Sequence, residues 1–203
     1  KYFSKKIQKR IVVIPNPNHI TPEERERTLV TPKENRVTIV GRLIPLKNHK
    51  MLINAFSKVH KYHPEYRLDI YGDGEMQGAI STQINELGLN DSIILRGRTG
   101  NVPSVLASAR IFVLCSNVEG MPNALMEAVA LGVPSIATDV SGVRDIINDG
   151  EDGFIIPVGD EVALEKKLLQ LMDSEDLQRK FAVSSAVVVE KFDKKKIFGQ
   201  WLD

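Results

Sequence analysis

Residues 111–138 read IFVLCSNVEGMPNALMEAVALGVPSIAT, and the prediction of the whole fold starts from this stretch. A short apolar run at 111–114 predicts a strand, and the apolar stretch at 122–131 is long enough for a buried helix. A second short run at 134–137 predicts another strand. The stretch therefore reads as a strand–helix–strand unit, which joins two parallel strands.

The same alternation continues on both sides of this unit. Further strands are predicted at 10–14, 36–40, 67–71, 92–95 and 153–156, and further helices at 48–63, 75–87, 102–109, 142–147 and 161–172. Strands that alternate with helices form a parallel sheet covered on both faces, with right-handed crossovers. The sequence therefore predicts an α/β fold, a doubly wound, Rossmann-like parallel sheet.

Three regions are predicted along the chain. Residues 21–190 hold the alternation and form the main domain, whereas 1–20 contain Asn16 between two prolines, which makes it a stiff turn or hinge. Residues 191–203 look helical and combine basic with aromatic residues. Such a tail either lies on an anionic membrane surface or packs its aromatic side chains on the protein, and we favour packing. It contains Lys191, Phe192, Lys194, Lys195, Lys196, Phe198, Trp201 and Leu202.

Composition excludes several classes of protein. The net charge of +1 argues against a nucleic-acid binder, and no apolar run approaches the length of a membrane span. One cysteine excludes a disulfide framework and indicates a reducing compartment, so Cys115 is read as a core residue. No metal site is expected, because the four histidines form no ligand-like cluster. The start lacks an initiating methionine and reads as a cut inside a longer protein.

Two glutamates bracket the start of the apolar helix at 122–131. If both were helical, Glu119 and Glu127 would lie about 12 Å apart. Retaining glycosidases hold their carboxyl groups about 5–5.5 Å apart, so an acid–nucleophile pair is not favoured. The free N–H groups of residues 123–125 suit an anion, with the glutamates gripping hydroxyls around it. The alternative is a surface Glu119 and a structural Glu127, whose carboxylate needs partners.

Ligands of doubly wound sheets bind beyond the carboxyl ends of the strands, which selects the loop at 41–48. Arg42 offers a bidentate fork and Lys47 a point charge, and both suit phosphate oxygens. Asn48 is placed to cap the helix that follows. The alternative is that both cations are solvated surface charges.

Two further loops carry glycines. Gly72, Gly74 and Gly78 fail the dinucleotide fingerprint, because one residue too many precedes the third glycine, and an oxidoreductase is therefore not favoured. The Gly72-Asp73-Gly74 turn is read as backbone that approaches a ligand or a neighbour closely. The small residues of Gly97-Arg98-Thr99 would let a flat ring reach the backbone.

Three of these motifs together resemble the group 1 (family 4) retaining glycosyltransferases. They are Gly41-Arg42-Leu43 with Lys47-Asn48, Ile14-Pro15-Asn16-Pro17, and the stretch from Glu119 to Glu127. The resemblance covers nearly the whole chain, but only the C-terminal, donor-binding half of the two-domain GT-B fold of that family. It implies that 1–20 hold the end of a missing N-terminal domain and the interdomain hinge at Asn16.

The resemblance also implies a role for each motif. Glu119 would contact the donor sugar, Glu127 the ribose, and Gly97-Arg98-Thr99 the base. Arg42 and Lys47 would neutralise the diphosphate without a metal, which makes Arg42, Lys47 and Glu119 the residues closest to the chemistry. The remaining donor-binding positions are Gly120, Met121, Asn123, Ala124 and Leu125. The sequence departs from the family at Val143-Arg144-Asp145, where many members have a proline–glutamate pair.

The activity implied is retaining transfer of a hexose or N-acetylhexosamine from a nucleotide sugar, for which we expect UDP. The acceptor is a glycan or lipid-linked molecule held by the missing N-terminal domain, so the isolated chain is expected to bind donor weakly and to transfer nothing. No cofactor and no nucleic acid are expected, and the location is cytoplasmic with peripheral contact at the inner membrane face. Two alternatives stay open: a non-catalytic nucleotide-sugar binding module, and a sugar-nucleotide epimerase of the same architecture.

Overall fold

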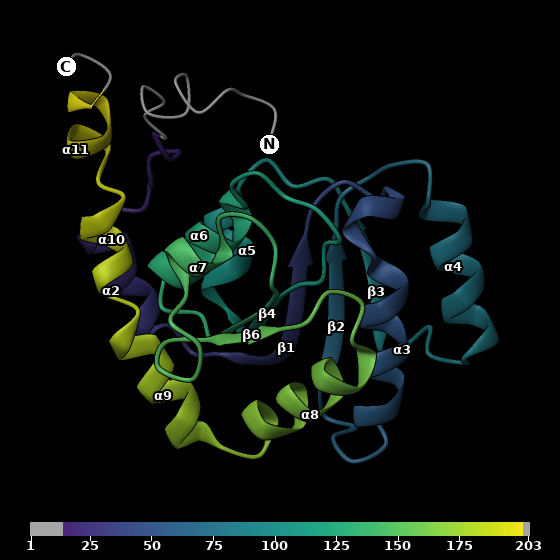
Figure 1. The fold of residues 1–203 in the computed structure, drawn as a ribbon. Helices are drawn as coiled ribbons and strands as arrows, with labels where there is room; N and C mark the ends of the chain where they lie inside the picture. The colour runs from purple at the N-terminus through teal and green to yellow at the C-terminus, as the bar shows by residue number, and fades with distance from the viewer. Residues whose placement is uncertain (1–13, 201–203) are drawn as a thin grey trace.

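The computed structural model describes residues 14–200 and contains a six-stranded parallel sheet (Figure 1). The strand order is β3-β2-β1-β4-β5-β6. This is the order of a doubly wound Rossmann fold, in which the chain reverses its direction across the sheet between β3 and β4, so the predicted fold class is confirmed. The strands are β1 Glu34–Val40, β2 Arg67–Tyr71, β3 Ile93–Gly97, β4 Ala109–Leu114, β5 Ser135–Thr138 and β6 Phe154–Ile156.

Helices cover both faces of the sheet, and the sheet separates the hydrophobic core into two clusters. Strand β4 shows why, because successive side chains of a strand point to opposite faces. Ile111 and Val113 pack with the helices α3 (His49–Val59), α4 (Gln77–Glu86) and α8 (Glu161–Met172). Phe112 and Leu114 pack with α5 (Val102–Ala107), α6 (Asn123–Ala130) and α7 (Val143–Ile146). The continuous apolar run of β4 therefore marks a strand buried on both sides.

One helix lies where the sequence analysis predicted none. Helix α2, Pro22–Val30, begins with a capping box in which Thr21 accepts from the backbone of Glu24 and the Glu24 carboxylate accepts from the backbone of Thr21. The sequence shows no apolar periodicity at this helix, because the buried residues of α2, Arg25 and Thr28, are polar. Arg25 donates to the carbonyls of Val129 and Ala130, so α2 is held at the C-terminal end of α6.

The last helices run along one side of the domain, as Figure 1 shows for α9 (Glu175–Ser184), α10 (Val187–Lys191) and α11 (Lys194–Gly199). Phe192 is 1% exposed, so the predicted packing of the aromatic side chains of the tail holds for this residue, and Ile197 is equally buried. Phe198 is 47% exposed, and its neighbours Lys194, Lys195 and Lys196 are exposed too. Trp201 and Leu202 lie outside the described residues.

Several predicted boundaries move. Residues 10–13 of the first predicted strand lie outside the described part, and Ile14 belongs to no strand. Pro122 is the N-cap of α6 rather than its first residue, and Gly97 ends β3 rather than opening the loop. Among residues 14–200, no helix combines the length and apolarity needed to cross a bilayer.

Candidate functional site

The parallel pairing of β1 with β4 brings the two charged loops together at the carboxyl edge of the sheet. Lys47 ends the short 3-10 helix η1 (Pro45–Lys47), and its Nζ lies 2.5 Å from Oε1 of Glu119. The hydroxyl of Ser116 donates to the same oxygen at 2.6 Å. The Glu119 side chain is only 12% exposed. Lys47 and Glu119, each singled out from the sequence, therefore form an ion pair at this edge.

Backbone contacts hold these two loops against each other. The N–H of Asn117 donates to the carbonyl of Leu46 at 2.8 Å, and the Cys115 thiol lies 3.2 Å from the carbonyl of Lys47. Asn48 has a positive φ of 47° and does not cap α3 with its side chain, contrary to expectation. Its amide donates instead to Oδ1 of Asn117 at 3.2 Å. Asn48 therefore joins the two loops.

Cys115 has the structural role that the sequence predicted. Its side chain is fully buried, and burial raises its pKa to about 12. A thiol with this pKa stays protonated at neutral pH and acts as a donor to the η1 backbone rather than as a nucleophile.

The first turn of α6 supplies the predicted anion-binding amides. The first intrahelical bond runs from the N–H of Met126 to the carbonyl of Pro122, so the N–H groups of residues 123–125 have no acceptor within residues 14–200. The Leu125 side chain is fully buried, so this residue offers only its amide. The loop before the helix rests on Gly142, where a Cβ would lie 2.7 Å from the carbonyl oxygen of Gly120 and 3.1 Å from the Met121 sulfur.

Of the two cations in the candidate site, Arg42 makes fewer interactions than Lys47 within the described residues. It is exposed, and it has no side-chain hydrogen bond or ion pair within the described residues. The next residue, Leu43, is 1% exposed and anchors the loop in the core. The stem of Lys47 lies over Gly41, at 3.6 Å from where a Cβ would stand. An anion that enters at this edge therefore meets one guanidinium with unused donors.

The third predicted loop lies at the end of β3. The carbonyl of Gly97 accepts from the N–H of Gly72 at 2.8 Å, and the hydroxyl of Thr99 accepts from the N–H of Asn101 at 3.1 Å. The Arg98 side chain is 81% exposed, and its Nε lies 3.8 Å from Asp73. The hydroxyl of Thr99 thus serves a local turn, and the base-binding role of this loop stays a prediction.

Glu127 and Asn16 face one cavity. The amide of Asn16 donates to Oδ1 of Asn123 at 2.8 Å, which links the segment before α2 to the first residue of α6. Glu127 lines a polar cavity of about 270 Å³ with Asn16, Pro17, His19, Asn123 and Met126. We expected its carboxylate to have partners, but it has no hydrogen bond or ion pair within the described chain. Burial raises its pKa.

At residues 143–145, where the sequence departs from the family pattern, Arg144 makes a local ion pair. Arg144 donates from Nε and Nη2 to the two carboxylate oxygens of Asp139, at 2.9 and 2.7 Å. The bidentate pair holds the guanidinium against its own loop.

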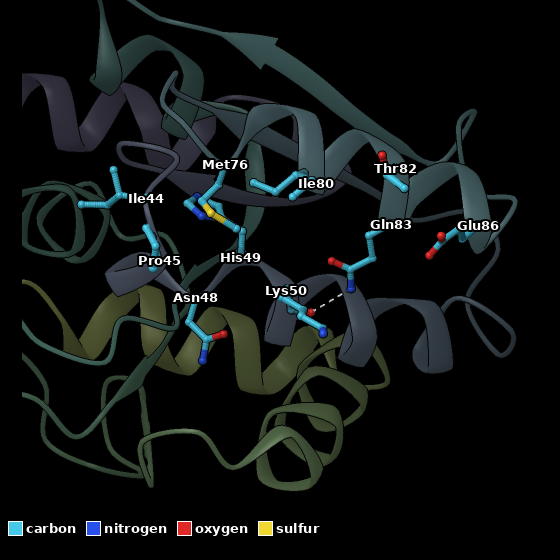
Figure 2. Close-up of a pocket in the computed structure, with 11 residues that line it drawn as sticks. Ile44, Pro45, Asn48, His49, Lys50, Met76, Ile80, Thr82, Gln83 and Glu86 are labelled. Atoms are coloured by element: carbon cyan, nitrogen blue, oxygen red, sulfur yellow. Dashed lines mark hydrogen bonds between the residues drawn. The ribbon is translucent and has the colours of Figure 1, made fainter.

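A larger, mostly apolar cavity of about 550 Å³ adjoins the Lys47 loop, between η1, α3 and α4 (Figure 2). His49 lines it at 3% exposure, and neither ring nitrogen has a partner within the described residues. Burial and the nearby charge of Lys47 lower its pKa to about 4. The sequence placed His49 only among histidines without a cluster, because its burial depends on the packing of α4.

Comparison with known proteins now identifies the family. Residues 20–185 match the family model described as "Glycosyl transferases group 1". The chain therefore belongs to the group 1 glycosyltransferases.

Among curated proteins, the chain is 30% identical to an N-acetylgalactosaminyltransferase of Campylobacter jejuni, over all of this chain and 56% of that protein. The name of that relative describes an acceptor linked to undecaprenol diphosphate. The chain is also 30% identical to the poly(glycerol-phosphate) alpha-glucosyltransferase of Bacillus subtilis, over 85% of this chain and 26% of that one. It thus spans at most about half the length of these relatives.

Among solved structures, the GT-B enzyme TarM of Staphylococcus aureus superposes with a TM-score of 0.80 at 25% identity, over 95% of this chain and 37% of that one. Its structure was solved with UDP. The pneumococcal O-GlcNAc transferase GtfA, solved with UDP and GlcNAc, gives 0.78 at 26% identity over 93% and 37%. The C-terminal domain of a group 1 protein from Francisella tularensis shares the fold, with a TM-score of 0.72 over 94% of its length.

Replacing Glu127 by glutamine should stabilise the chain at neutral pH. The folded-state pKa is raised above the ordinary value of 4.5, so ionised Glu127 costs stability above both values and nothing below them. Glu127→Gln should therefore unfold at a higher temperature than wild type at pH 7, and this advantage should vanish as the pH falls below about 4.5. Thermal unfolding followed by circular dichroism measures both. The exposed Glu151→Gln should show no such gain, and an equal gain there would contradict the assignment.

His49 should make the chain sensitive to acid. Its pKa is lowered from 6.5 to about 4, so its contribution to stability is complete above pH 6.5 and is lost as the pH falls through 4. Between pH 7 and pH 4, the free energy of unfolding of His49→Leu should improve relative to wild type by about 3 kcal/mol. Urea unfolding across this range measures it, with the exposed His19→Leu as the control. Parallel pH profiles for His49→Leu and wild type would refute the prediction.

Proposed function

We propose that this chain is the donor-binding half of a retaining glycosyltransferase that uses a nucleotide-diphosphate sugar. The observation that carries the proposal is the Lys47–Glu119 pair beside the first turn of α6. That arrangement places a cation and a carboxylate next to amides that lack acceptors, as a ligand with both a diphosphate and hydroxyl groups requires.

The diphosphate would bind between Arg42, Lys47 and the amides of residues 123–125. Two cations and a helix N-terminus supply the charge that a divalent metal supplies elsewhere, so we propose that donor binding needs no metal. Lys47 would then divide its donors between Glu119 and a phosphate oxygen, since an ammonium carries three.

The sugar and the nucleoside would occupy the two sides of the diphosphate. Glu119 would accept from hydroxyls of the donor sugar, next to the backbone of Gly120 and Met121. Glu127 would accept from the ribose, which satisfies a carboxylate that has no other partner in the described chain. The loop Gly97-Arg98-Thr99 would take the base through its backbone.

The reaction proposed is transfer with retention at the anomeric carbon. As the bond between sugar and phosphate breaks, negative charge grows on the leaving diphosphate and positive charge on the sugar. Arg42, Lys47 and the α6 amides would stabilise the leaving group more in the transition state than in the ground state. Water must be excluded, which requires closure against a second domain. The Asn16–Asn123 hydrogen bond would pass movement at the hinge to α6.

The complexes of TarM and GtfA with UDP support UDP as the nucleotide of the donor. The names of an N-acetylgalactosaminyltransferase and a glucosyltransferase among the curated relatives support a hexose or N-acetylhexosamine as its sugar. The names of the curated relatives describe transfer to lipid-linked or polymeric acceptors. We propose an acceptor of this class for the whole protein, held by a preceding N-terminal domain.

We also propose a cytoplasmic location with peripheral contact at the inner face of the membrane. The single cysteine, which is buried and free, supports a reducing compartment. Lys194, Lys195, Lys196 and the half-exposed Phe198 are all exposed, and Nζ of Lys194 lies 5.6 Å from the Phe198 ring centre. Such a group of side chains suits anionic headgroups.

UDP should bind to the 203-residue chain in titration calorimetry. Arg42→Ala and Lys47→Ala should each weaken binding by about ten- to a hundredfold, because each removes a charge-assisted contact to phosphate. The exposed Lys61→Ala should bind like wild type. Chelation by EDTA should leave the affinity unchanged, and the chain alone should release no UDP from a UDP-sugar. No heat with UDP, UDP-sugars or GDP-sugars at millimolar concentration would refute the proposal.

Vesicle flotation tests the membrane contact. Wild type should float with vesicles that contain phosphatidylglycerol and stay behind with pure phosphatidylcholine. The triple variant Lys194→Gln, Lys195→Gln, Lys196→Gln should lose about a hundredfold in vesicle affinity, at about 1 kcal/mol for each lysine. High salt should have the same effect. Equal flotation of the triple variant and wild type would refute this contact.

A further inference from the structure

The Gly72-Asp73-Gly74 turn lies between the two loops assigned to the two ends of the nucleotide. In the sheet, β2 pairs with β1 on one side and with β3 on the other. The turn that leaves β2 therefore stands between the Arg42 loop, which leaves β1, and Gly97-Arg98-Thr99, which leaves β3. The donor-binding residues predicted from the sequence do not include this turn.

Backbone hydrogen bonds connect the turn to both loops. On the β1 side, the N–H of Leu43 donates to the carbonyl of Asp73 at 2.7 Å, and the carbonyl of Leu43 accepts from the N–H of Met76 at 2.9 Å. On the β3 side, the N–H of Gly72 donates to the carbonyl of Gly97 at 2.8 Å. The residues that flank Arg42 and Arg98 are thus bonded to one short segment.

The approach to the Arg42 loop is too close for any residue except glycine. A Cβ at Gly72 would lie 1.8 Å from the carbonyl oxygen of Gly41, and a Cβ at Gly74 would lie 2.4 Å from that of Leu43. Both contacts are with backbone, which cannot rotate away. The φ angles of Gly72 and Gly74, 144° and 154°, also belong to a region that favours glycine.

We propose that Gly72 and Gly74 are positioning residues for donor binding. Their turn sets the place of the Arg42 loop relative to the Gly97-Arg98-Thr99 loop, and so the spacing between the diphosphate and the base. The inference rests on the proposed function, because it concerns the same nucleotide. It adds residues that act through Arg42 without touching the ligand.

Two other glycines allow the effect of position to be separated from the effect of strain. Gly88 has a positive φ of 67° but nothing within 4 Å of a Cβ, so Gly88→Ala strains the backbone without displacing a loop. Gly78 lies within α4 and also has open space around it. Gly78→Ala therefore controls for substitution near the turn.

The test is a double-mutant cycle on UDP affinity, measured by calorimetry well below the unfolding temperature of each variant. Gly74→Ala should weaken UDP binding by about tenfold, whereas Gly88→Ala and Gly78→Ala should bind within about twofold of wild type. In the Arg42→Ala background, Gly74→Ala should change the affinity by less than about twofold, because the guanidinium that it misplaces is gone. Additive losses, or an equal loss in Gly88→Ala, would overturn the proposal.

A second measurement uses wild type alone and does not depend on whether Gly74→Ala folds. UDP should slow hydrogen exchange at the amides of Gly72 and Met76, which bond the two loops but are not assigned to the nucleotide. Protection confined to residues 42–47, 97–99 and 123–125 would overturn the inference. If UDP does not bind to wild type at all, the proposed function fails first, so the two failures can be told apart.

Discussion

The parallel pairing of β1 with β4 is the contact on which the rest of the site depends. It joins the two halves of the doubly wound sheet at the point where the strand order reverses. The loop after β1 leads to α3 on one face of the sheet, and the loop after β4 leads to α6 on the other face, so the two loops diverge. η1 belongs to the first loop and Glu119 to the second. The hydrogen bond from Asn117 to Leu46 then fixes how far apart these loops stand. Acid and base meet there because of topology, not because of nearness in sequence.

Much of the fold could be predicted from the sequence because its signals are local. Short apolar runs that alternate with helical stretches predicted the parallel sheet. Because parallel strands end at one edge of a sheet, the loops of Lys47 and Glu119 were expected at the same edge. The Gly72-Asp73-Gly74 turn was expected to approach a ligand or a neighbour, and the neighbour is the loop at 41–43. Helix α2 was missed because Arg25 and Thr28 replace the usual apolar face, although Thr21 and Glu24 carried a capping signal.

The rest could not be predicted because it depends on contacts between distant segments. The burial of His49 depends on the packing of α4 beside it. The hydrogen bond that Asn48 makes to Asn117, in place of a helix cap, depends on the loop that follows β4. Glu127 has no hydrogen-bond or ion-pair partner within residues 14–200, contrary to the expectation that a carboxylate on a buried helix finds partners. A site built to receive a polar ligand leaves groups unsatisfied until the ligand arrives, and local rules fail at such groups. The roles of Asn16 and of Gly97-Arg98-Thr99 stay predictions.

Arg25 has a consequence at the opposite end of the helix that it caps. Its buried guanidinium lies against the last carbonyls of α6, where the partial negative charge of the helix is concentrated. Neutralising that pole leaves the positive pole at residues 123–125 without its compensating opposite. A side chain at the far end of α6 therefore strengthens the electric field at residues 123–125. Any attraction for an anion at those amides is thus partly built in during folding, through a contact at the other end of the helix.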